Sequence, residues 1–168
     1  MAKIALIYSY NTKKSGIAAE KIANAIGKKN VEMVNAEDID EKTFLSFDNF
    51  ILSAPTWFDG ELPNYWDEFV PALEDMDLKG KTVAIFGLGD QKGYPENFLD
   101  AIGLLGNLLE SRGATLVGET SIEGYSFESS KALRNGKFMG LGLDFENQKK
   151  LADQKIKDWV DDIKNHFK

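Results

Sequence analysis

Short apolar runs alternate along this chain with stretches that have helical spacing. The clearest runs are Ile4–Tyr8, Phe50–Ala54 and Val83–Gly87, and weaker ones are Val31–Asn35 and a segment that begins near Ala114. Continuous apolar runs of this length are typical of parallel strands that are buried on both faces. The alternation predicts repeated βαβ units, and therefore an α/β fold with helices on both faces of one sheet.

The intervening stretches predict the helices. We expect a first helix from near Ser15, a second from about Tyr65 to Asp75, a third from about Pro95 to Arg112, and a last one from about Asn147 to Phe167. Gly113 is a suitable stop for the third helix. Trp66 and Trp159 lie at helix-face spacing, which favours a place in the core. No linker or repeat divides the chain, so we expect one domain over residues 1–168.

The fifth strand is expected to be interrupted. A polar stretch from Thr120 to Lys137 separates its first part from an apolar run at Phe138–Leu143, where the strand is expected to resume. The inserted stretch either covers the edge of the sheet or docks a partner, and the structural role is the favoured interpretation.

Two glycine-containing turns each carry an aromatic residue directly after a predicted strand. Trp57 lies in the turn Ala54–Leu62, and Tyr94 ends the turn Phe86–Tyr94. Ligands of open parallel sheets collect beyond the carboxyl ends of the strands, where two neighbouring loops can hold a planar group between them. Trp57 and Tyr94 are therefore predicted to form the two walls of a slot for a flat ring.

The first loop is a candidate anion site. Ser9 to Ser15 lie between the first strand and the first helix, so the loop amides and the helix N-terminus can bind a phosphate group. A ring slot combined with a phosphate site suggests a mononucleotide.

Ordered motifs along nearly the whole chain resemble those of the flavodoxins, in particular the long-chain subclass. The matching segments are Ala54–Trp57, Gly60–Leu62, Phe86–Gln91, Gly93–Tyr94, Asn97–Phe98, Glu123–Tyr125, Ser130–Leu133, Gly136–Phe138, Leu143–Asp144 and Asn147–Gln148. The resemblance implies a doubly wound, five-stranded parallel sheet in the order 2-1-3-4-5, with an insertion in strand five. It also implies a low-potential one-electron carrier that is not an enzyme and holds FMN without a covalent bond.

The resemblance and the loop positions together give the candidate FMN contacts. In the family, rings at the positions of Trp57 and Tyr94 cover the two faces of the isoalloxazine. The candidates are Ser9, Tyr10, Asn11, Thr12, Lys13, Lys14, Ser15, Pro55, Thr56, Trp57, Phe58, Asp59, Gly60, Leu88, Gly89, Asp90, Tyr94, Asn97, Phe98 and Glu146.

The phosphate loop departs from the family pattern Thr/Ser-x-Thr-Gly-x-Thr/Ser. Tyr10 replaces a small hydroxyl residue, and Lys13 stands where glycine can adopt backbone angles that cost other residues free energy. Thr12 and Ser15 keep their hydroxyl groups, and Lys13 and Lys14 add positive charge. We expect this charge to offset part of the loss, so that FMN still binds.

Composition narrows the function classes. The net charge of −7 disfavours nucleic acid as a partner. The 168 residues contain no apolar stretch near the roughly 20 residues that cross a bilayer, so we expect no membrane partner. The first strand is expected to begin at Ile4, which leaves no room for a signal region, so we expect a location in the cytoplasm. We also expect a monomer. The absence of cysteine excludes thiol redox chemistry and cysteine-ligated clusters. The one histidine, His166, lies beside the C-terminus and is assigned no metal.

Acidic residues gather in and after the two aromatic turns, where they would attract a basic-faced redox enzyme. The family resemblance implies ferredoxin-NADP reductase as a partner. It implies electron acceptors such as a photosystem, nitrogenase or reductive biosynthetic enzymes.

Three other functions are compared with the residues of the chain. An FMN-dependent NAD(P)H:quinone reductase needs an open ring face, which Trp57 and Tyr94 are placed to close, and the chain has no separate dinucleotide motif. A flavodoxin-fold binding module with weakened FMN binding is kept open by Tyr10 and Lys13. A phosphoacceptor domain needs acidic residues at the ends of the first and third strands, and Tyr8 to Ser9 and Ser53 to Pro55 provide none.

Overall fold

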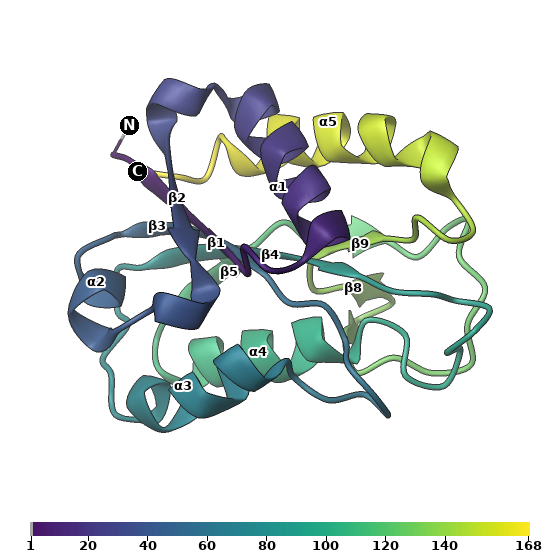
Figure 1. Cartoon of the computed structure of the whole chain (residues 1–168), viewed down its shortest axis with the longest axis horizontal. Coiled ribbons are helices and arrows are strands. Elements are labelled where there is room, and N and C mark those ends of the chain that lie inside the picture. Colours follow the sequence, from purple (N-terminus) through teal and green to yellow (C-terminus); the bar gives the residue numbers. More distant parts are fainter. Residues whose placement is uncertain (1) are drawn as a thin grey trace.

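A central parallel sheet lies between two layers of helices (Figure 1). The computed structural model describes residues 2–168. Helices α1 (Lys13–Ile26) and α5 (Ala152–Ile163) cover one face of the sheet, and α3 (Asn64–Glu74) and α4 (Asp100–Ser111) cover the other. The predicted α/β arrangement with helices on both faces is confirmed.

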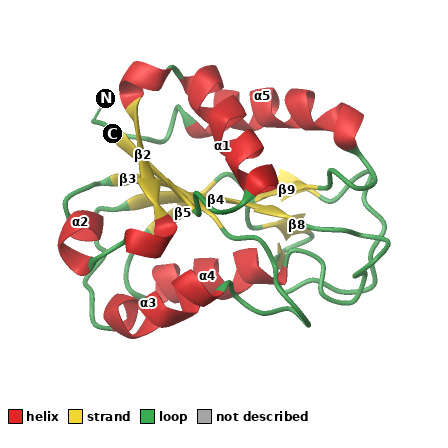
Figure 2. Ribbon diagram, in the orientation of Figure 1, coloured by secondary structure: helices red, strands yellow, loops and turns green. Residues whose placement is uncertain are grey.

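The main sheet has the predicted strand order. Its strands are parallel, in the order β2-β1-β3-β4-β5. They are β1 (Ile4–Tyr8), β2 (Val31–Asn35), β3 (Asn49–Ser53), β4 (Thr82–Leu88) and β5 (Thr115–Val117). Long loops gather at one end of the molecule, beyond the carboxyl ends of the central strands (Figure 2).

The fifth strand is broken, as predicted. Strand β9 (Leu141–Leu143) pairs with β4 just beyond β5: Ala84 faces Val117, and Phe86 faces Leu141. The segment between them forms a small antiparallel sheet in the order β6-β8-β7. Its strands are β6 (Thr120–Ser121), β7 (Leu133–Arg134) and β8 (Lys137–Phe138).

The strand resumes at Leu141 and not at Phe138. Phe138 pairs with Thr120 in the small sheet, and its buried ring lies 5.8 Å from that of Phe98. The apolar run therefore belongs to two elements. Phe138 packs in the aromatic cluster of the insertion, and Leu141 pairs with β4 in the main sheet.

Two helix starts differ from expectation. Helix α1 begins at Lys13 because Thr12 is the extended N-cap residue, which places both lysines in the first turn. Helix α4 begins at Asp100 and not at Pro95, because Leu99 has a left-handed backbone (φ 60°) that a helix cannot include. Asn97 therefore lies in a loop.

The last helix is shorter than expected. The segment that starts at Asn147 first forms a turn and the 3-10 helix η3 (Lys149–Leu151), and α5 ends at Ile163. Helix α3 agrees with its predicted range to within a residue at each end. The 3-10 helices η1 (Lys28–Asn30) and η2 (Ala36–Asp38) and helix α2 (Glu41–Leu45) were not predicted.

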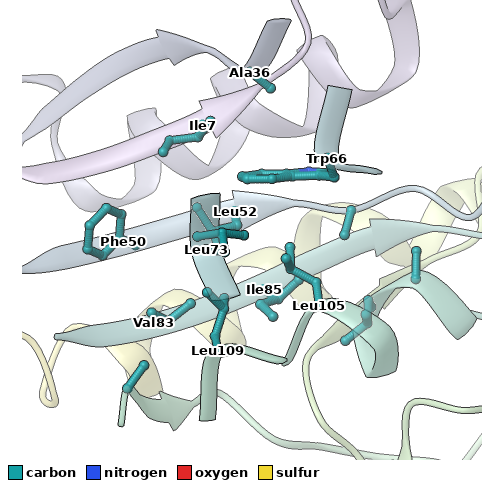
Figure 3. Packing of buried hydrophobic residues seen from close by; sticks show 14 of the residues in the cluster. Ile7, Ala36, Phe50, Leu52, Trp66, Leu73, Val83, Ile85, Leu105 and Leu109 are labelled. Atoms are coloured by element: carbon teal, nitrogen blue, oxygen red, sulfur yellow. The ribbon is translucent and has the colours of Figure 1, made fainter. Parts of the chain in front are cut away.

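Each face of the sheet has its own core. Alternate residues of β1 point to opposite sides: Ile4 and Leu6 pack with α1 and α5, and Ala5 and Ile7 pack with α3 and α4. Trp66 is fully buried, in the layer that Figure 3 shows with Ile7, Leu52 and Leu73. Trp159 is 3% exposed, so both tryptophans lie in the core as predicted.

Both buried indoles have hydrogen-bond partners. The Nε1 of Trp66 donates to the carbonyl oxygen of Ser53 at 2.8 Å, and the Nε1 of Trp159 donates to that of Gly118 at 2.9 Å. Each bond fixes a helix to the end of a strand. Among residues 2–168, no helix is both long and apolar enough to cross a membrane.

Replacing Trp66 by phenylalanine tests the first of these bonds. We expect Trp66→Phe to lower the free energy of unfolding by about 1–3 kcal/mol, because the buried Ser53 carbonyl loses its donor. Urea unfolding followed by circular dichroism measures the change. Trp57→Phe is the control, since Trp57 is only partly buried, and a loss as large as that of Trp66→Phe would contradict the assignment.

Candidate functional site

Two adjoining hollows open between the loop after β3 and the loop after β4. Their volumes are about 260 and 300 Å³. Both are lined by Thr56, Trp57, Gly89, Asp90 and Tyr94. The two aromatic turns that the sequence singled out therefore border one continuous slot at the carboxyl edge of the sheet.

The loop that carries Trp57 is a tight, closed turn. Trp57 and Glu61 exchange two backbone hydrogen bonds, of 2.9 and 2.7 Å. The turn between them requires positive φ at Phe58 (49°) and Gly60 (88°). The Trp57 ring meets the ring of Tyr65 edge-on at 5.9 Å, so a buried residue of α3 supports it from the protein side. This fixes the orientation of the indole at the slot.

The start of α4 supports the same turn. A side chain at Gly60 would place its Cβ 2.6 Å from Oδ2 of Asp100, so only glycine fits here. Asp100 is 3% exposed, and burial raises the pKa of its carboxyl group. Its Oδ1 accepts a hydrogen bond of 2.7 Å from the amide of Lys131. Asp100 thus joins the inserted segment to the Trp57 loop.

Asp90 accepts several hydrogen bonds that hold the loop after β4 in place. This carboxylate accepts hydrogen bonds from the amide of Gly93 at 2.8 Å, from Nδ2 of Asn147 at 2.8 Å and from the amide of Lys92 at 3.2 Å. The Gly93 bond is the main cause that lowers the pKa of Asp90. The turn presents Tyr94 with 62% of its surface exposed. A large exposed ring on a fixed turn is suited to stack on a ligand.

The loop between β1 and α1 ends at a helix N-terminus. Thr12 donates through Oγ1 to the carbonyl of Ser9 at 2.7 Å, which leaves the first amides of α1 facing outward from the helix end. Ser9 and Ser15 are each 1% exposed. Tyr10 is largely exposed and packs on Tyr8, with 5.0 Å between ring centroids.

One expectation for this loop is wrong. Lys13 occupies the first position of α1, and among the described residues only Phe58, Leu99 and Asn135 are non-glycine residues with positive φ. The backbone cost that was expected at Lys13 therefore does not arise. Lysine fits because the helix starts earlier than the sequence suggested.

Several lysines lie near the candidate anion site at the start of α1. Lys14 forms an ion pair with Glu146, and both residues line the hollow of about 300 Å³. Lys13 and Lys14 also line a groove of about 640 Å³ between α1 and η3. The other lysines of this groove are Lys21, Lys149 and Lys150.

The structure brings most of the predicted residues to the slot. Phe58, Asn97 and Phe98 line one hollow, and Lys14, Pro55, Leu88 and Glu146 line the other. Asp59 and Gly60 instead border a neighbouring groove of about 700 Å³. Ser9, Tyr10, Asn11, Thr12, Lys13 and Ser15 lie outside the two hollows of the slot.

Two residues that sequence reasoning missed also line the slot. Leu99 lies there because its left-handed backbone ends the loop before α4. Phe145 lies there as the neighbour of Glu146. Phe145 follows the motif Leu143–Asp144, so its position in the chain could have indicated it.

Comparison with known proteins identifies the family. The family model described as flavodoxin matches residues 6–159. The chain belongs to the flavodoxin family. A flavodoxin from Nostoc sp. is 43% identical over 165 residues, which cover 98% of this chain and 97% of that protein. The predicted membership of the flavodoxin family is thereby confirmed.

Solved structures agree with this assignment. The crystal structure of a flavodoxin from Fusobacterium nucleatum bound to flavin mononucleotide has a TM-score of 0.95 and 35% identity, and covers 100% of both chains. Its K13G variant, also bound to flavin mononucleotide, has a TM-score of 0.95, 34% identity and coverage of 100% and 98%. Flavodoxins are electron-transfer proteins and not enzymes, as was predicted for this chain.

Two carboxylates of the site are expected to respond to acid in opposite directions. The native pKa of Asp90 lies below its ordinary value, so its bonds stabilise the fold above about pH 4 and are lost as the pH falls through the lowered pKa. The native pKa of Asp100 is raised, so protonation at falling pH favours the folded state. In Asp90→Asn the free energy of unfolding should therefore fall less steeply as the pH is lowered. In Asp100→Asn it should fall more steeply.

Urea unfolding of both variants at several pH values between about 2 and 6 measures these slopes. Equal changes of slope in the same direction would contradict the two environments described above.

Proposed function

We propose that this chain is a low-potential one-electron carrier that binds one FMN without a covalent bond and exchanges electrons with redox proteins. The observation that carries the proposal is the slot between Trp57 and Tyr94, which adjoins a helix N-terminus suited to a phosphate. The F. nucleatum flavodoxins with the same overall fold, which are bound to flavin mononucleotide, support it.

The proposed contacts follow the layout of the site. Trp57 and Tyr94 would flank the isoalloxazine ring, and the loop from Ser9 to Ser15 would bind the phosphate. The remaining contacts would come from Pro55, Thr56, Phe58, Asp59, Gly60, Leu88, Gly89, Asp90, Asn97, Phe98 and Glu146. The buried ring of Phe98 would contribute through its edge only, because it packs on Tyr125, Phe127 and Phe138.

Lys13 is compatible with FMN binding. The F. nucleatum flavodoxin whose K13G variant was crystallised carries, by that name, a lysine at its own position 13, and the unsubstituted protein is also bound to flavin mononucleotide. In this chain Lys13 needs no positive φ and adds positive charge in the first turn of α1. A phosphate dianion would gain from that charge.

The residues around the slot would lower the reduction potential. FMN supplies the one-electron chemistry, and the protein sets how readily it is reduced. Asp90 keeps its negative charge because its hydrogen bonds favour the ionised form, and a nearby negative charge opposes the addition of electrons to the ring. Stacking on Trp57 and Tyr94 would favour the electron-poor oxidised ring.

An acidic surface beside the slot suits a basic-faced partner. Asp59, Glu61, Asp67 and Glu74 line the groove next to the Trp57 loop. Charges of one sign steer an oppositely charged protein toward the cofactor edge. We propose ferredoxin-NADP reductase or a similar enzyme as partner, with acceptors such as a photosystem, nitrogenase or reductive biosynthetic enzymes. A single domain, a monomeric state and a cytoplasmic location belong to the same proposal.

Titration of the apoprotein with FMN tests the cofactor. We expect one FMN per chain, with flavin fluorescence quenched by the adjacent rings, and a bound flavin that accepts electrons stepwise under anaerobic photoreduction. Millimolar affinity would instead support the binding module with weakened FMN binding. Rapid oxidation of NADPH with a quinone and no added reductase would favour the quinone reductase.

Removing either ring should weaken binding. Stacked aromatic pairs contribute about 0.5–1.5 kcal/mol beyond the area they bury, so we expect Trp57→Ala and Tyr94→Ala each to raise the Kd for FMN about tenfold. Fluorescence titration measures the Kd. Tyr94→Phe keeps the ring and is the matched control; a loss as large as that of Tyr94→Ala would argue against stacking.

A further inference from the structure

A carboxylate of the protein itself, that of Glu37, is bound to the loop between β1 and α1. Oε2 of Glu37 accepts a hydrogen bond of 2.6 Å from the hydroxyl of Ser9 and one of 2.5 Å from Nδ2 of Asn11. Both donors belong to the loop between β1 and α1 that would bind the phosphate of FMN. The backbone N–H of Asn11 also points inward, since it donates to Oγ of Ser9 at 3.2 Å.

The strand order brings Glu37 to this place. Tyr8 ends β1 opposite Asn35, which ends the adjacent parallel strand β2. The loop after β1 and the 3-10 helix η2 after β2 therefore start side by side. Oδ1 of Asn35 accepts from the amides of both Tyr10 and Glu37, each at 3.2 Å, and so ties the two segments together.

The carboxylate of Glu37 and a phosphate group would use the same kind of hydrogen-bond donors in the loop. Each is an anion that accepts hydrogen bonds from hydroxyl and amide donors. Glu37 takes those of Ser9 and Asn11, and Asn11 is two residues from the first residue of α1. Glu37 is thus bonded to the same short loop that would bind the phosphate, and charges interact over roughly 10 Å at moderate salt.

We infer that Glu37 limits the preference of the site for phosphorylated over unphosphorylated flavin. It fixes the loop by accepting from Ser9 and Asn11, and its negative charge opposes the phosphate. The isoalloxazine slot, formed by other loops, does not include Glu37. The effect is therefore confined to the phosphate end. This inference rests on the proposed binding of FMN.

The variant Glu37→Gln separates the two contributions. Glutamine keeps a side-chain oxygen that can accept from Ser9 and Asn11, but it removes the charge. Asp38→Asn is the matched control, because Asp38 lies in the same 3-10 helix and its carboxylate accepts from Asn35 and not from the loop. Both substitutions change the net charge by the same amount on exposed residues.

The experiment measures the Kd of each protein for FMN and for riboflavin, which lacks the phosphate. We expect Glu37→Gln to bind FMN about three- to tenfold more tightly than the unsubstituted protein, at moderate salt, while the Kd for riboflavin stays the same. Asp38→Asn should change the ratio of the two constants by less than about twofold.

An unchanged ratio in Glu37→Gln, or weaker FMN binding, would overturn the role of Glu37 and leave the proposed function intact. An equal gain for both flavins would also overturn it, because the effect would not depend on the phosphate. No binding of either flavin by any of the three proteins would overturn the proposed function together with this inference.

Discussion

Burial of both faces of β1, β3 and β4 is the constraint on which the rest of the molecule depends. Helices cover each face, so no side chain of these strands reaches solvent except at their ends. Chemistry is thereby confined to the loops at the carboxyl edge. The order of the strands then decides which loops are neighbours: those after β3 and β4 line the slot, and the loop after β1, where we propose that the phosphate binds, lies beside the segment after β2.

The parts of the fold that follow from repeated apolar patterns could be predicted from the sequence. The five strands, their order and the break in the fifth followed from runs such as Ile4–Tyr8 and from the family motifs. The walls of the slot followed because Trp57 and Tyr94 have no place in a helix face. Exact helix starts did not follow, because Leu99 adopts a left-handed backbone that no local residue preference requires.

Contacts between distant segments could not be predicted either. Glu37 reads as one more exposed acid on a surface turn, and only the pairing of Tyr8 with Asn35 brings it to the first loop. Asp100 reads as a residue inside the predicted third helix, yet it lies at the helix start, where it contacts both Gly60 and Lys131. Such roles depend on register and on loop path, which a single sequence does not specify.

The broken fifth strand shows how a segment can be optional for topology and necessary for packing. Val117 and Leu141 face residues of β4 that are only two positions apart, so a single linking residue would restore a continuous strand. Yet a side chain at Gly103 would collide with the carbonyl of Lys131, and Phe138 belongs to the buried core beside α4. Excision of the insertion would leave the hydrogen-bond ladder whole and uncover one end of α4.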